Sequence, residues 1–178
     1  MTQDGEDVRK VEVLEYQDEW PLLFETEKKI LHQVFQENIY TILHIGSTAV
    51  PGLAAKPIID IMPVVYKLEQ VDTLNKKMGQ LGYIAKGENG LSGRRYFEKG
   101  GEQRTHHVHL FQLGNEEIER HLAFRDYLRT HPKEVLRYGV LKKESALCYP
   151  YDISAYITAK TNLVTEIEQL ALEWYETK

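Results

Sequence analysis

The segment 44–61 contains the residues whose types and order most directly suggest chemistry. One apolar run leads into Gly46-Ser47-Thr48, and a second apolar run further along carries Asp60 at its centre. A glycine lets the backbone approach a ligand closely, a serine adds a hydroxyl, and free backbone amides in such a turn bind phosphate oxygens. We therefore predict that Gly46, Ser47 and Thr48 bind a phosphate group.

Asp60 is an acidic residue in a run of isoleucines. Because a buried carboxylate without a partner is costly, we expect Asp60 to face a metal ion, a lysine such as Lys56, or backbone donors. Lys56 is also a candidate for binding phosphate. The alternative is a tight turn followed by a purely structural Asp–Lys pair.

Three histidines occur within four residues, at His106, His107 and His109. In a strand, alternation places His107 and His109 on one face. Together with Asp60 they would form a nitrogen and oxygen site, which favours zinc, manganese or iron over magnesium. The same histidines could instead donate to phosphate oxygens or act as a general acid or base, or they could stand on a solvated strand face. We predict Asp60, His107 and His109 as the metal-binding and catalytic residues, with a divalent metal (Mg, Mn or Zn) as cofactor.

Two further cations are candidates for binding phosphate. Arg94 and Arg95 follow a glycine-rich stretch, and a guanidinium can clamp a phosphate with two hydrogen bonds. Adjacent residues of a strand face opposite sides, so only one of them can reach a given ligand, and we assign that role to Arg95. Lys160 lies four residues after Tyr156 on a predicted helix and shares its face. For both cations the alternative is a solvated surface charge.

Two common nucleotide-binding motifs are absent from the sequence. Gly52 is not followed by the Lys and Ser or Thr that complete G-x-x-x-x-G-K-[ST], and there is no G-x-G-x-x-G. The arrangement resembles instead the nucleotidyltransferase signature, in which a Gly-Ser turn precedes Asp-x-Asp or Asp-x-Glu on the next strand. Here twelve residues separate Ser47 from Asp60, and Met62 stands where the second carboxylate would be. A thioether is a poor magnesium ligand, so the two-carboxylate cradle cannot form from this strand.

More narrowly, the chain resembles the GrpB family. The residues that carry this resemblance are 44–53, 56–61, 94–97, 106–110 and 124–128, together with Tyr156 and Lys160. The resemblance covers nearly the whole chain. It implies a small soluble protein of bacterial type with a nucleotidyltransferase-like fold, sometimes found fused to dephospho-coenzyme A kinase.

The elements that must position these residues are read from hydrophobic periodicity and turn residues. Strands are predicted over 11–13, 39–45, 58–62, 83–85, 94–99 and 105–113, and helices over 20–35, 67–81, 116–130, 132–147 and 152–175. Asp18 is a candidate cap for the first helix. The strands 83–113 lie together in the sequence, which favours an α+β fold with a mixed or antiparallel sheet flanked by helices. We expect a core over 1–115 and a C-terminal helical segment over 116–178 that packs on it as one structural unit.

Charge and composition exclude several classes of protein. The net charge of −5 argues against nucleic acid or a membrane surface as the partner. The acidity belongs to the two ends, because residues 38–160 hold 17 basic and 13 acidic residues. The polar, acidic start (1–7) differs from a secretory signal, and with a single cysteine it leads us to expect a cytoplasmic protein.

The sequence therefore predicts a protein that binds a nucleotide or another phosphorylated small molecule in a locally positive cleft. Metal-dependent nucleotidyl transfer is the reaction class that the fold resemblance suggests. The alternatives are a binding or regulatory module that has kept the fold without the chemistry, and a metal-dependent hydrolase built on the histidines and Asp60.

Overall fold

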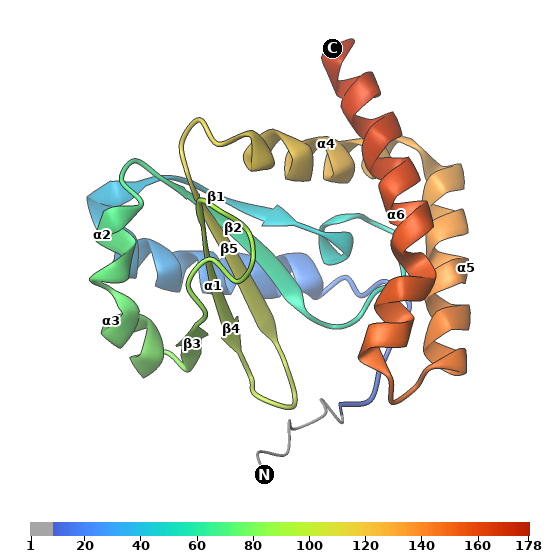
Figure 1. Cartoon of the computed structure of the whole chain (residues 1–178), viewed down its shortest axis with the longest axis horizontal. Helices are drawn as coiled ribbons and strands as arrows, with labels where there is room; N and C mark the ends of the chain where they lie inside the picture. Colours follow the sequence, from blue (N-terminus) through green and yellow to red (C-terminus); the bar gives the residue numbers. More distant parts are fainter. Residues whose placement is uncertain (1–8) are drawn as a thin grey trace.

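A computed structural model describes residues 9–178 of the protein. A five-stranded mixed sheet forms its centre (Figure 1). The acidic start at 1–7 lies outside these residues. Along the sheet the order is β1 (Ile39–Ile45), β2 (Ile59–Val65), β5 (His106–Gln112), β4 (Arg94–Lys99) and β3 (Tyr83–Ala85). The β2–β5 pair is parallel and the other three pairs are antiparallel. The predicted α+β class with a mixed sheet is confirmed.

Helices cover both faces of this sheet (Figure 1). The long ones are α1 (Trp20–Phe35), α4 (Glu116–Thr130), α5 (Pro132–Cys148) and α6 (Ile153–Glu176), and the short ones are α2 (Glu69–Asp72) and α3 (Asn75–Gln80). One sheet face packs on α1, α2 and α3, whereas α4 covers part of the other face. Among the described residues, no helix has both the length and the apolar character needed to cross a membrane.

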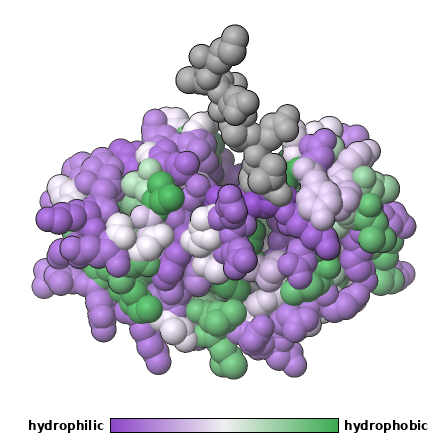
Figure 2. All heavy atoms as spheres, turned by 90° about the horizontal axis from the view of Figure 1, so that it is seen from below, coloured by the Kyte–Doolittle hydropathy of each residue, from purple (hydrophilic) through white to green (hydrophobic). Residues whose placement is uncertain are grey.

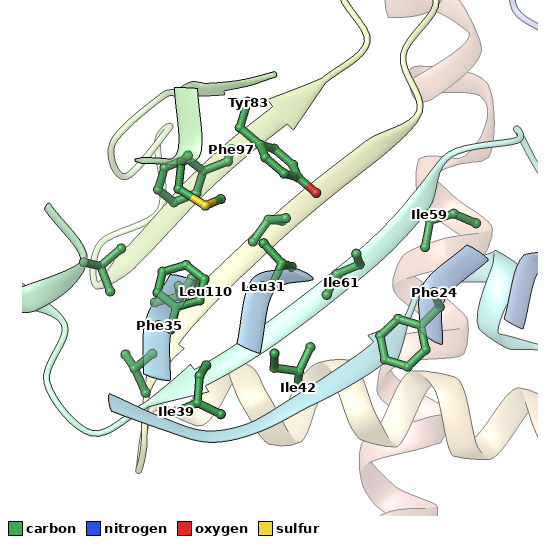
Figure 3. Packing of buried hydrophobic residues seen from close by; sticks show 14 of the residues in the cluster. Phe24, Leu31, Phe35, Ile39, Ile42, Ile59, Ile61, Tyr83, Phe97 and Leu110 are labelled. Carbon is green, nitrogen blue, oxygen red and sulfur yellow. The ribbon is translucent and has the colours of Figure 1, made fainter. Parts of the chain in front are cut away.

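The main core lies between α1 and the sheet, where Phe24 and Leu31 of the helix meet Ile42 and Ile61 of the strands (Figure 3). One acidic residue is also buried there. Glu27 Oε1 accepts hydrogen bonds from the Tyr83 hydroxyl at 2.7 Å and from Lys99 Nζ at 3.1 Å, so its charge is compensated.

A second cluster joins α4, α5 and α6 to the loop between β1 and β2. Val50 and Leu53 of that loop are fully buried against side chains such as Leu128 and Ile167 of the helices. The loop follows directly after the Gly-Ser turn. The three C-terminal helices therefore hold the turn against the end of the sheet.

Three details of the predicted elements are wrong. The helix predicted over 67–81 is divided, because the Thr73 hydroxyl bonds to the Gln70 carbonyl at 2.7 Å and Leu74 leaves the helical region. The strand predicted over 11–13 is reduced to a single bridge between Leu14 and Ala55. The cap position of α1 is Glu19, without a side-chain hydrogen bond, and not Asp18.

The face of the molecule that is seen from below is mainly hydrophilic (Figure 2). Seen from below in Figure 2, the described residues on this face show apolar side chains in separate small groups, without one continuous apolar patch. Isolated apolar residues of this kind are ordinary on a protein surface.

A matched pair on α1 tests the position of the core. Leu31 is fully buried, while Leu22 is 68% exposed on the same helix. We expect Leu31→Ala to lower the free energy of unfolding by about 2 to 5 kcal/mol, because it leaves a cavity in the core. Leu22→Ala should change it by less than about 0.5 kcal/mol. Urea denaturation of both variants measures the difference, and equal losses would show that α1 does not bury this face.

Candidate functional site

Asp60 lies at the centre of the candidate site, and the pairing of β2 with β5 supplies its partners. The parallel register places Asp60 opposite His107, and His109 follows two residues later on the same face. Asp60 Oδ1 is 2.9 Å from His109 Nε2 and 3.5 Å from His107 Nδ1. One potential ligand atom from each of the three side chains lies within 4.8 Å of the other two. The structure thus brings together the three residues predicted as metal ligands.

The two histidines keep the Asp60 carboxylate ionised. Burial by itself raises the pKa of Asp60, but hydrogen bonds and charge interactions with His107 and His109 outweigh it and hold this pKa well below its usual range. An ionised carboxylate is the form that binds a cation. Asp60 is therefore in its ligand form at neutral pH.

The outer contacts of the histidines determine where their protons lie. Arg104 Nη1 is 3.2 Å from His107 Nε2, and the same nitrogen donates to Glu98 Oε2 at 2.5 Å. Because a guanidinium can only donate, His107 Nε2 accepts and its proton is on Nδ1, facing Asp60. In His109 the nitrogen nearer to Asp60 donates to it, and the buried Nδ1 has no hydrogen-bond partner among the described residues. In both rings a proton therefore occupies the place between nitrogen and carboxylate.

Gly46 allows the turn after β1 to pass directly beside Asp60. Its φ is +72°, and a Cβ added at this position would lie 2.7 Å from Asp60 Oδ2. An L side chain here would therefore be strained and would also collide with the carboxylate. The group that Gly46 approaches closely is thus the Asp60 side chain, and phosphate binding by this turn stays a prediction.

The two hydroxyls of the turn have different partners. Ser47 Oγ accepts a hydrogen bond from Lys142 Nζ at 2.9 Å and lines both cavities described below. Thr48 is buried, and its Oγ1 lies 2.9 Å from His44 Nε2. Burial lowers the pKa of His44 to about 4, so this ring stays neutral at pH 7. The Thr48 hydroxyl therefore holds the turn in place, and that of Ser47 is directed toward the cavities.

A cavity of about 150 Å³, which we call the lysine chamber, opens between the turn and the C-terminal helices. Its wall contains three lysines, Lys56, Lys142 and Lys160, and it also includes Asp60. Burial and the neighbouring Lys56 lower the pKa of Lys160 to about 8. Of the nine residues predicted for the site, eight lie at this end of the sheet. These are Gly46, Ser47, Thr48, Lys56, Asp60, His107, His109 and Lys160.

A neighbouring cavity of about 320 Å³ continues from the lysine chamber between α4 and α6. The two share Ser47, Asp60 and Lys160, and the neighbouring cavity adds ring and aliphatic side chains such as Phe124 and Ile157. A third cavity, of about 450 Å³, includes Lys56 but neither Asp60 nor Ser47. The two smaller cavities therefore form the cleft beside the predicted site residues.

Arg95 is not brought to the site. On β4 the side chains of Tyr96 and Glu98 lie opposite His109 and His107, so the intervening residues point to the other face of the sheet. Arg95 forms its ion pair there, with Nε 2.7 Å from Asp72 Oδ1. Alternation separates Arg94 from Arg95 as expected, and it places Arg95 on the sheet face away from Asp60.

Lys142 is the main site residue that the sequence prediction missed. It lies on α5, where the buried residues include Tyr138, Lys142 and Ser145, at spacings of four and three. The available signal was the position of Lys142 four residues after Tyr138, which places both residues on the same helix face. This signal is easily overlooked because Lys143 follows directly, and two adjacent lysines are typical of a solvated helix face.

Met62 occupies the position of a second carboxylate and is fully buried. It packs with Ile45 and Phe111 on the sheet face that carries Asp60. These apolar neighbours offer no oxygen ligand to an ion at this position. The expected absence of a two-carboxylate cradle on β2 therefore agrees with the packing.

The sheet topology, the Gly-Ser turn and the Asp on the following strand define a nucleotidyltransferase-like fold. A solved structure of a mutant Cid1 poly(U) polymerase bound to MgATP is similar to this chain with a TM-score of 0.50 and 12% sequence identity, over 74% of this chain and 43% of that one. At this level of identity the similarity concerns the fold.

The chain belongs to the GrpB family, whose model, described as GrpB protein, matches residues 10–170. A crystal structure of the conserved protein GrpB from Enterococcus faecalis has a TM-score of 0.90 and 48% identity, and the match covers 92% of this chain and 99% of that chain. The UPF0157 protein YqkA of Bacillus subtilis is 49% identical over 166 residues, which are 93% of this chain. The chain spans about half of that relative's length, 48%.

Two glycines with similar backbone angles test the contact between the turn and Asp60. Gly46 and Gly52 have φ values of +72° and +82°, but a Cβ at Gly52 would meet nothing within 4 Å. In both alanine variants, backbone strain at a positive φ should lower the free energy of unfolding by about 1 kcal/mol or more. Gly46→Ala should lose at least a further 1 kcal/mol and shift the imidazole NMR signals of His107 and His109, because it displaces the carboxylate. Equal stability losses, with unchanged histidine signals in both variants, would contradict the contact.

Proposed function

We propose that this protein binds a nucleotide or another phosphorylated small molecule beside a divalent metal ion held by Asp60, His107 and His109. The observation that carries the proposal is the cluster of three potential ligands, within 4.8 Å of one another, at the edge of a chamber lined by three lysines. Side chains that could bind a metal ion thus lie next to lysines that could bind an anion. A phosphate group that is coordinated to the metal ion would contact both sets of side chains.

The donor set fits a transition metal better than magnesium. One carboxylate oxygen and two imidazole nitrogens are typical ligands of zinc or manganese, and three protein ligands leave positions for a substrate oxygen. An ion at this place would replace the protons that now lie between the two rings and Asp60. When bound, such an ion polarises a phosphoryl oxygen and offsets its negative charge.

The residues of the cleft would divide the remaining tasks. Ser47, Lys56 and Lys160 would bind phosphate oxygens, with Lys160 offsetting their charge. The neighbouring cavity, with Phe124 and Tyr138 in its wall, would take the rest of the ligand. This division follows from the two cavities meeting at Asp60 and Ser47.

Nucleotidyl transfer is the reaction class that the fold suggests, and this inference is an analogy. The second candidate function is a binding module that does not catalyse transfer. The apolar packing of Met62 favours it, because Met62 stands where a second metal-binding carboxylate would be. The two differ in their products, since transfer from a nucleoside triphosphate releases pyrophosphate. Pyrophosphate release in the presence of Mn²⁺ would support transfer, and ligand binding without release would support the module.

Direct metal binding tests the cluster. Titration calorimetry with Mn²⁺ or Zn²⁺ should show one site, and His107→Ala, His109→Ala and Asp60→Asn should each weaken it by more than about 100-fold, because each removes one of three ligands. His32→Ala, which changes an exposed histidine on α1, is the matched control and should bind like the unchanged protein. Wild-type affinity in all three site variants would show that the ion does not bind there.

Nucleotide binding is measured separately, by the melting temperature. ADP with Mn²⁺ at 100 times its dissociation constant should add about 2.7 kcal/mol of stability. For a chain of this size such a gain corresponds to a rise of roughly 5 to 10 °C. No rise with ADP, AMP, ATP or pyrophosphate, at millimolar concentration and with metal present, would contradict the proposed function.

A further inference from the structure

Ser47 and Lys142 form a hydrogen bond between the turn after β1 and helix α5. Lys142 Nζ lies 2.9 Å from Ser47 Oγ, and the lysine residue is 2% exposed. Within residues 9–178, no carboxylate lies within ion-pairing distance of Lys142. A buried amine that is hydrogen-bonded to a serine hydroxyl is one of the arrangements that activate serine as a nucleophile.

Ser47 lies where a ligand of the cleft would meet it. It lines both the lysine chamber and the neighbouring cavity, and so does Asp60. The residue before it, Gly46, is so close to Asp60 that an added Cβ would lie 2.7 Å from Oδ2. A phosphate group that reaches a metal ion at Asp60 would therefore lie beside the Ser47 hydroxyl.

The other polar side chains near the turn have different partners. The Thr48 hydroxyl is buried and lies 2.9 Å from an imidazole nitrogen of β1. His107 and His109 both contact the carboxylate of the candidate metal cluster. Lys142 is therefore the proton acceptor in direct contact with the hydroxyl of Ser47.

The surroundings of Lys142 favour its neutral form, which is the form that accepts a proton. A hydroxyl and the Tyr138 ring, whose centre is 4.3 Å from Nζ, only partly replace the water around an ammonium group. Burial, followed by the nearby lysines, lowers the pKa of Lys142 well below its ordinary value, although Asp60 acts in the opposite direction. The titratable groups that face the chamber or contact Lys142 are Lys56 before β2, Asp60 of β2, His107 of β5, Tyr138 of α5, and Tyr156 and Lys160 of α6.

We propose that Ser47 is a nucleophile, with Lys142 as its general base, and that it attacks a phosphorus atom of the bound ligand. The inference rests on the proposed function and deepens it, because it adds a covalent step to the binding of a phosphorylated molecule. The product is a phosphoester on the serine.

The step balances as follows in atoms and electrons. A bond forms between Ser47 Oγ and phosphorus, while the bond from phosphorus to the leaving-group oxygen breaks and its electron pair stays on that oxygen. The proton of Ser47 Oγ passes to Lys142 Nζ. When the α-phosphorus of a nucleoside triphosphate is attacked, the products are a nucleotidyl-serine and pyrophosphate. Water or an acceptor hydroxyl that attacks the same phosphorus later releases the serine, whose oxygen regains a proton.

The experiment is mass spectrometry of the intact, Mn²⁺-loaded protein after incubation with ATP at about pH 8. We expect a mass gain of one adenylyl group, which peptide fragmentation locates on Ser47, together with a burst of pyrophosphate. A gain of one phosphoryl group on Ser47 would also support the nucleophile and would place the attack at the γ-phosphorus. Ser47→Ala should show neither gain.

The melting temperature of the same samples separates this inference from the proposed function. A rise with ATP and Mn²⁺, without an adduct on Ser47, would overturn the inference and leave the proposed function in place. An adduct on a different residue would also overturn the inference. If neither ATP nor ADP, AMP or pyrophosphate raises the melting temperature, and no adduct forms, both are overturned.

Two variants separate a base at Lys142 from a structural lysine. Lys142→Met keeps the length of the side chain but accepts no proton, so the rate of adduct formation at saturating ATP should fall at least about 100-fold. Lys142→Arg keeps a donor but stays protonated, so the rate should fall as far. Lys133→Met, at an exposed position of the same helix, should leave the rate unchanged. In the unchanged protein the rate should rise with pH as Lys142 loses its proton. Adduct formation at the unchanged rate in both Lys142 variants would show that Lys142 does not act as the base.

Discussion

The contact of Asp60 with His107 and His109 is the interaction around which the rest of the site is arranged. It exists because β2 and β5 pair in parallel with Asp60 opposite His107, which places a carboxylate and two imidazoles on one face of the sheet. The carboxylate lies at the point where β1 ends, so the following turn must pass close to it. That requirement explains Gly46, whose missing Cβ leaves room for Asp60.

Charge is distributed unevenly across the same end of the sheet. Asp60 is paired with the two histidines, whereas Lys142 and Lys160 face the chamber without acidic partners among the described residues. The main core lies away from this chamber, between α1 and the opposite face of the sheet, whereas Lys142 borders the second cluster through Tyr138. The proposed binding of a phosphorylated ligand would give a reason to retain a charge that lowers the stability of the free protein.

The sequence predicted the parts of the structure that depend on local pattern. Strand alternation placed His107 and His109 on one face, and the Gly-Ser turn next to Asp60 followed from residue types. The pattern could not say which face of β4 meets the ligand, so Arg95 was assigned to the site although it pairs with Asp72 on the other face. Lys142 was missed because the environment of a helix face depends on tertiary packing, and a Lys-Lys pair in a polar helix indicates solvent.

We propose that one cleft holds both a metal ion at Asp60 and the phosphorylated ligand beside it. A crystal structure of the protein with Mn²⁺ and ADP, recorded with anomalous diffraction at the manganese edge, tests both parts at once. The account predicts a manganese peak between Asp60, His107 and His109, with phosphate oxygens within hydrogen-bond distance of Ser47 and Lys160. Manganese bound elsewhere, or a nucleotide bound outside the lysine chamber, would contradict it.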